Sequence, residues 1–147
     1  MLLAVLHRAV GPQLDHHVLE IPVHGVCSLD VLAVEAVETG AVTAGEFLVA
    51  TDARRKEVYV ARYDERGARL TGPVVDKPAA LETDDPVVGE GAALYPEAFP
   101  HRTGPAAPSA GWLARVVTDR RAELLDPEPL YLRRPDAVAP GKPKRVS

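Results

Sequence analysis

A cluster of charged side chains around one predicted turn has the residue types that could do chemistry. Asp52 follows the apolar run at residues 47–50, and Arg54, Arg55 and Lys56 come just after it. A carboxylate at the end of a buried strand can hold a metal ion or position a water molecule. Opposite charges at a solvated turn can instead pair with one another. We favour local pairing and keep a hydrolase-like or nucleotide-binding Asp52 as the alternative.

Two glycines frame a second position at which a ligand could bind. Gly89 and Gly91 follow the apolar residues 86–88 and come before a predicted helix. At such a place the backbone can approach a phosphate group closely. A plain turn is favoured, because connections from strand to helix often use glycine. The sequence has no Gly-x-x-x-x-Gly-Lys-Ser/Thr loop, which excludes a P-loop nucleotide site.

The sequence contains no established pattern for a nucleophile or a metal centre. Cys27 and Ser28 lie at a predicted strand-to-helix turn that does not fit Gly-x-Ser-x-Gly, so we expect Cys27 to be buried and Ser28 to cap the helix. His16 and His17 are adjacent and point in different directions on any regular element, and no His-Glu-x-x-His motif is present. We therefore predict no catalytic residue, no metal site and no cofactor.

The elements that must position these residues alternate between strands and helices. Hydrophobic spacing and turn residues predict strands at residues 21–23, 47–50, 57–63, 69–71, 86–88 and 130–132, and helices at 29–38, from 78 and from 109 to a stop at Pro127. Residues 47–71 form a three-strand antiparallel meander with its third strand at the sheet edge. Residues 1–20 show no clean period. An α/β domain with a mixed sheet follows from this order.

Length and charge limit the class of protein further. The chain has 147 residues, 46% of them hydrophobic and 26% charged, which suits one globular domain. No apolar stretch approaches the roughly 20 residues that cross a bilayer. The single cysteine excludes an internal disulfide and indicates a reducing compartment. We therefore predict a cytoplasmic protein without membrane contact.

The charge is unevenly distributed along the chain. The whole chain carries −4, yet residues 133–147 hold five basic residues and one acidic residue. Phosphate backbones are bound by clustered Lys and Arg, so a third hypothesis is an RNA-binding module that uses this tail. The candidate contacts to RNA or to a partner are Arg54, Arg55, Arg133, Arg134, Lys142, Lys144 and Arg145.

Four blocks of the sequence, taken in order, resemble the TsaB family, also called YeaZ. They are residues 21–30 (IPVHGVCSLD), 52–59 (DARRKEVY), 89–91 (GEG) and 129–136 (PLYLRRPD). The resemblance implies an α/β, ribonuclease-H-like lobe of the actin/Hsp70-type ATPase (ASKHA) fold. Such a lobe has a mixed sheet whose three-strand antiparallel meander is flanked by helices.

This resemblance implies a role in making N6-threonylcarbamoyladenosine in the anticodon loop of tRNAs that read codons beginning with A. TsaD transfers the group, while TsaB is a noncatalytic scaffold that pairs with TsaD and helps recruit the ATPase TsaE. We therefore expect TsaD and TsaE as partners, indirect contact with tRNA, no catalysis by this chain alone, and a homodimer as a further option. ATPases of this fold have a glycine-rich hairpin where this chain has Arg54 and Arg55, which favours a lobe without nucleotide chemistry.

The resemblance departs from the family pattern at the N-terminus. Family members carry a complete N-terminal lobe before the block at 21–30, and here 20 residues precede it. We expect a divergent segment at 1–20, a remnant of the N-terminal lobe at 21–40, the C-terminal lobe at 46–134 and a basic flexible tail at 135–147. A truncated or mis-assigned start would leave pairing with TsaD open.

Overall fold

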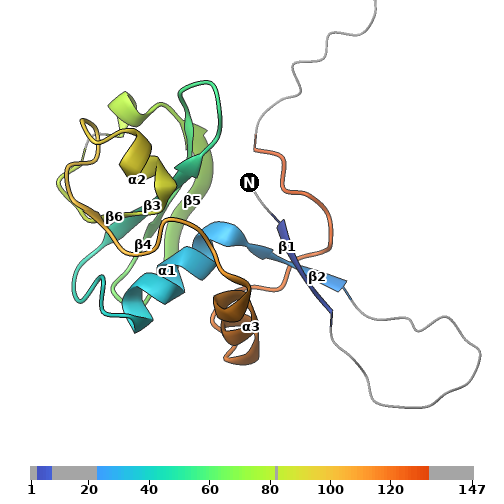
Figure 1. Cartoon of the computed structure of the whole chain (residues 1–147). Coiled ribbons are helices and arrows are strands. Elements are labelled where there is room, and N and C mark those ends of the chain that lie inside the picture. Colours follow the sequence, from blue (N-terminus) through green and yellow to red (C-terminus); the bar gives the residue numbers. More distant parts are fainter. Residues whose placement is uncertain (1–2, 8–22, 82, 133–147) are drawn as a thin grey trace, which may run out of the picture.

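The core of the molecule is a five-stranded mixed sheet (Figure 1). The computed structural model describes residues 3–7, 23–81 and 83–132. The strand order is β5-β4-β3-β6-β7, with antiparallel pairing between β5, β4 and β3 and parallel pairing between β3, β6 and β7. The strands are β3 (Phe47–Asp52), β4 (Val58–Tyr63), β5 (Arg69–Asp76), β6 (Val87–Val88) and β7 (Arg102–Thr103). The predicted meander, and its third strand at the sheet edge, are confirmed.

In the described residues, three α-helices and one short 3-10 helix accompany the sheet. They are α1 (Ser28–Glu38), η1 (Pro78–Ala80), α2 (Glu90–Leu94) and α3 (Ala110–Thr118). A separate two-stranded antiparallel sheet pairs β1 (Leu3–His7) with β2 (Val23–Cys27). Within the described residues, no helix has the length and apolar character needed to span a membrane.

Both faces of the sheet are covered, as the apolar run at residues 47–50 predicts. On one face, α1 packs through Leu29, Leu32 and Ala36 against Phe47 and its neighbours. On the other face, α2 and the segment after it pack Ala92 and Phe99 against the even-numbered side chains of β3. Because β3 lies between these two layers, its first four residues are buried.

Helix α1 is buried around most of its circumference, not only along the predicted face. Asp30, Val31 and Val34 are buried together with the predicted apolar residues. The helix contacts the sheet, β2 and α3, so neighbours surround it on several sides. It ends as predicted at Gly40, which has a φ of 73° and donates its N–H to the carbonyl of Val37.

Two predictions about local structure were wrong, and one strand was not predicted. Ser28 is the first residue of α1 and makes no capping bond, because the helix begins one residue earlier than expected, with Cys27 at the N-cap position. Residues 130–132 form no strand. Residues 3–7 form β1 although their sequence shows no period, because pairing with β2 supplies their order.

The third helix is shorter than the spacing of its apolar residues predicts. Ser109 caps α3 as expected, accepting a bond from the N–H of Trp112 at 3.2 Å. The helix ends at Thr118, well before Pro127, because Arg120 adopts a left-handed φ of 54° and Arg121 donates its N–H to the carbonyl of Val116. This is a Schellman ending without glycine, so the sequence carries no stop signal there.

A buried hydrogen bond joins α1 to the sheet. The hydroxyl of Tyr63 donates to Oδ1 of Asp30 at 2.7 Å, and Nε of Arg69 lies 3.5 Å from the same oxygen. Burial raises the pKa of the Asp30 carboxyl, while Tyr63 and Arg69 oppose that shift. A raised pKa in the folded state means that the ionised carboxylate opposes folding above that pKa.

We therefore predict that Asp30 makes the protein relatively more stable as the pH falls through the folded pKa of this group towards its ordinary value of 3.8. Asp30→Asn removes the titrating group and keeps an acceptor for Tyr63. Urea denaturation from pH 7 down to pH 4, just above that ordinary value, should show wild type gaining stability relative to Asp30→Asn at the lower pH.

Asp85→Asn is the control with the opposite sign. The hydrogen bond from Arg62 lowers the pKa of Asp85, so this carboxylate stabilises the fold above its unfolded pKa. Wild type should lose stability relative to Asp85→Asn as the pH falls below 3.8, the ordinary pKa of this carboxyl, so this comparison is extended to pH 3. A stability difference between wild type and Asp30→Asn that does not change with pH would contradict the prediction.

Candidate functional site

The predicted residues Asp52, Gly89 and Gly91 come together where β3 ends and α2 begins. A cavity of about 160 Å³ lies there, lined by Ser28, Thr51, Asp52, Tyr59, Glu90 and the loop at residues 106–108. Strand β3 supplies Asp52, and the start of α2 supplies Glu90. The parallel register of β3 and β6 places these two carboxylates at the same end of the sheet.

Asp52 pairs within its own turn, as the favoured interpretation predicts. Its Oδ1 accepts the N–H of Arg54 at 2.8 Å, and its Oδ2 lies 3.2 Å from Nη1 of Arg54. Arg54 is 88% exposed, so its ion pair with Asp52 contributes little to stability. The backbone bond to the carboxylate is the more important of the two, since it holds the turn in shape.

Three consecutive residues of this turn have left-handed backbone conformations. Arg54, Arg55 and Lys56 have φ values of 65°, 56° and 61°. Each such residue costs about 1 kcal/mol when it carries a Cβ. Bonds from Ala53 N–H to the Glu57 carbonyl, and from Glu57 N–H to the Arg54 carbonyl, close the turn. The basic side chains are therefore displayed from a fixed backbone.

The two glycines have a packing role that the sequence did not reveal. A Cβ at Gly89, whose φ is 103°, would lie 2.3 Å from the carbonyl oxygen of Ala50. A Cβ at Gly91 would lie 2.9 Å from the same oxygen. The absence of side chains thus lets the start of α2 lie directly against the backbone of β3.

The strand-end cavity suits a phosphate group poorly. Ligand pockets commonly measure about 300–1,000 Å³, which is well above the size of this one. Asp52 and Glu90 both present carboxylates to it, and these repel an anion. The space beside Gly89 and Gly91 is occupied by the backbone of β3.

Cys27 is buried, as predicted, and is a poor candidate for a nucleophile. Burial is the main cause that raises the pKa of its thiol, and the nearby Asp30 carboxylate acts in the same direction. A thiol that stays protonated reacts slowly. In the described part of the chain, no three side chains of His, Cys, Asp or Glu gather as a metal site would require.

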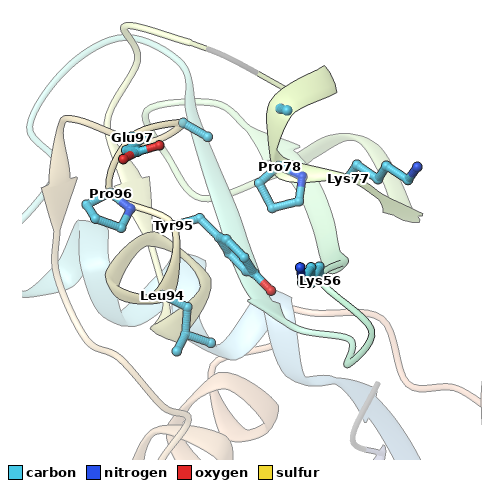
Figure 2. A pocket seen from close by; sticks show the side chains of 9 residues that line it. Lys56, Lys77, Pro78, Leu94, Tyr95, Pro96 and Glu97 are labelled. Atoms are coloured by element: carbon cyan, nitrogen blue, oxygen red, sulfur yellow. The ribbon is translucent and has the colours of Figure 1, made fainter.

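A second, larger cavity lies at the other end of α2 (Figure 2). It measures about 470 Å³ and is lined by Lys56, Lys77, Pro78, Ala79 and residues 94–98. The register that pairs Val58 with Asp76 places the turn before β4 and the end of β5 at one end of the sheet. Sequence analysis missed this site, because its residues are far apart in the chain and form no motif.

The remaining basic candidates divide between the surface and the part of the chain that is not described. Arg54 and Arg55 are exposed on the turn between β3 and β4. Arg133, Arg134, Lys142, Lys144 and Arg145 lie outside the described residues. Their proposed contacts with RNA or a partner stay predictions, as do the four boundaries proposed for the chain.

Comparison with known proteins identifies a family and relatives that match most of this chain. Residues 16–106 match the family described as TsaD: tRNA N6-adenosine threonylcarbamoyltransferase. The chain is 43% identical over 124 residues to Rv3421c of Mycobacterium tuberculosis (strain ATCC 25618 / H37Rv), covering 82% of this chain and 54% of that protein. It is 40% identical over 122 residues to ML0378 of Mycobacterium leprae (strain TN), covering 82% and 32%. The chain thus spans about half or less of these curated relatives.

A solved structure shares the fold. It is described as the crystal structure of a protein with similarity to peptidase YEAZ from Pseudomonas aeruginosa. The TM-score is 0.55 at 27% identity, over 74% of this chain and 57% of that one. The likeness supports the ASKHA-type lobe that the sequence predicts.

We predict that Gly89→Ala destabilises the protein by about 3 kcal/mol, because it adds both backbone strain and a clash with Ala50. Gly45→Ala is the matched control: Gly45 has a φ of 75°, yet an added Cβ would meet nothing within 4 Å. It should cost about 1 kcal/mol, the strain alone. Urea denaturation of both variants measures the difference, and equal losses would show that the close approach to β3 is unimportant.

We also predict that Asp52 acts through its acceptor oxygen. Asp52→Asn retains an oxygen that can accept the N–H of Arg54, so stability should change little. Asp52→Ala removes it and should cost about 1 kcal/mol. Thermal or urea unfolding of the two variants tests this, and an equal effect of both would mean that the bond does not hold the turn.

Proposed function

The chain belongs to the TsaD (tRNA N6-adenosine threonylcarbamoyltransferase) family and is a TsaB (YeaZ)-like member of it, and we propose that it is a noncatalytic subunit of tRNA threonylcarbamoyladenosine synthesis. In this role it supports TsaD as a scaffold or dimerisation partner. TsaD transfers the threonylcarbamoyl group to the anticodon-loop adenosine of tRNAs that read codons beginning with A.

The observation that carries the noncatalytic assignment is the chemistry of the strand-end cavity. In ATPases that this fold resembles, a glycine-rich hairpin grips phosphate at the corresponding place. Here Arg54 and Arg55 occupy the hairpin, and Asp52 and Glu90 line a cavity of about 160 Å³. A small cavity with two carboxylates favours a supporting role over binding of a nucleoside triphosphate.

The proposed partners follow from the family. TsaD is the direct partner, the ATPase TsaE joins the complex, and tRNA is contacted indirectly through TsaD. A homodimer is the alternative assembly for the chain when TsaD is absent. The family model spans residues 16–106, so it includes α1 and all five strands of the main sheet, which would present such surfaces.

Co-purification tests the partnership. Tagged TsaD from the same cell should retain this chain, or a form extended at its N-terminus, on an affinity column. The two forms are compared side by side, because the chain spans only part of its curated relatives. Failure of both forms to bind TsaD would overturn the proposal.

Reconstituted tRNA modification tests the noncatalytic role. We predict that the chain alone forms no threonylcarbamoyladenosine from threonylcarbamoyl-adenylate and tRNA, and that it raises the yield when TsaD is present. Asp52→Asn should support TsaD within about twofold of wild type, because its acceptor still holds the turn. Product formation without TsaD, or loss of about tenfold or more with Asp52→Asn, would contradict a noncatalytic role.

A further inference from the structure

The larger cavity has the size and the lining of a small-molecule site. At about 470 Å³ it falls within the range of about 300–1,000 Å³ that is typical for bound ligands. Its wall is apolar, formed by Pro78, Leu94, Pro96 and the ring of Tyr95. Leu94 is 54% exposed, which leaves apolar surface that a ligand could cover.

The polar side chains that line this cavity have no partners among the described residues. Among the described residues, neither Lys56 nor Lys77 has its ammonium within 4.0 Å of a carboxylate oxygen, and the Tyr95 hydroxyl and Glu97 carboxylate make no hydrogen bond. Arg54 and Arg62, in contrast, are paired with carboxylates. The side chains of Lys56, Lys77, Tyr95 and Glu97 that line the cavity can therefore bind a ligand.

Both lysines project from backbone that is held in place. Lys56 is the last residue of the left-handed turn, which the bond from Glu57 N–H to the Arg54 carbonyl closes at 3.0 Å. The N–H of Lys77 donates to Oδ1 of Asp76 at 2.7 Å, and its carbonyl accepts from Ala80 at 2.9 Å. Because the backbone at both residues is fixed, only the Lys77 side chain has to change its conformation for the two ammonium groups to reach one anion.

The positive and negative side chains of the cavity lie on different sides of the Tyr95 ring, which indicates the kind of ligand that would fit. In Figure 2, Lys56 and Lys77 lie on one side of Tyr95 and Glu97 lies on the other; the Lys56 ammonium lies near the ring, and the Lys77 side chain extends away from it. A matching ligand has an anionic group at one end, a flat ring in the middle and an N–H donor at the far end. Phosphate binds lysine, bases stack on aromatic rings, and carboxylates accept from the N–H groups of bases.

We propose that this cavity binds a nucleotide, with its phosphate at Lys56 and Lys77, its base against Tyr95 and an N–H group of the base at Glu97. The nucleotide comes either from the free pool or from a single-stranded RNA segment, which present the same chemistry. This site is separate from the strand-end cavity, and it does not depend on the proposed partnership with TsaD.

Titration with adenosine 5′-monophosphate, followed by amide chemical shifts of the full chain, tests the proposal. Saturable shifts should centre on residues 56, 77 and 94–98, with a Kd of about 1 mM or tighter. Adenosine and inorganic phosphate, each lacking half of the ligand, should bind about tenfold more weakly. A short single-stranded oligoadenylate that binds more tightly to the same residues would identify RNA as the source, and one that binds no better would identify the free nucleotide.

Variants separate this site from general attraction of anions. Tyr95→Leu and Lys56→Met should each weaken binding by about tenfold. Arg102→Met is the matched control: it also removes one positive charge, from an exposed position in β7, and should leave the affinity unchanged. Glu97→Leu should weaken the mononucleotide but not ribose 5-phosphate, which has no base.

Two results would overturn the proposal. One is the absence of saturable shifts around the cavity up to about 10 mM of the mononucleotide. The other is binding that Arg102→Met weakens as much as Lys56→Met does, since that would be nonspecific attraction to positive charge. Retained dispersion of the amide spectrum shows that each variant is folded, so a loss of binding can be assigned to the cavity.

Discussion

The close approach of α2 to the central strand is the constraint on which the two cavities depend. Gly89 and Gly91 let the backbone lie where any side chain would meet the carbonyl of Ala50. This contact places Glu90 beside Asp52 at one end of α2, and residues 94–98 beside Lys56 and Lys77 at the other. A shift of the helix away from β3 would alter both cavities together.

The two ends of α2 consequently differ in chemistry. One end has a small space with two carboxylates, which disfavours phosphate. The other end has a larger space with an aromatic ring and two lysines that pair with no carboxylate in the described part of the chain, which favours phosphate. The turn at Arg54, Arg55 and Lys56 contributes to both, because Asp52 holds its first residue and Lys56 faces the larger cavity. The proposed nucleotide site therefore lies away from the strand-end cavity.

The main sheet could be predicted because its signals are local. The buried strands β3 and β6 are visible in the sequence as apolar runs at residues 47–50 and 86–88. Gly40 marks the end of α1, and Ser109 marks the start of α3. The predictions failed where a structure depends on strands far apart in the sequence, or on a backbone conformation that the local sequence does not indicate. Strand β1 depends on β2, and α3 ends at a left-handed arginine that no propensity rule identifies.

The candidate site was predictable only in part, for the same reason. Asp52, Gly89 and Gly91 were found from their neighbours in sequence. The packing role of the two glycines could be recognised only from the structure, which shows the Ala50 carbonyl oxygen against them. The larger cavity combines a turn, the end of β5 and the end of α2, and only the strand register brings them together. The family, in turn, was recognisable from four short blocks whose order is more specific than any single block.

The most direct test of the central claim is the threonylcarbamoyladenosine content of tRNA, measured by mass spectrometry, in cells that contain TsaD but lack this chain. A supporting subunit predicts that the modification falls in these cells. It also predicts that wild type and Asp52→Asn restore the modification equally when either is supplied again. Unchanged modification in the absence of the chain would contradict the account.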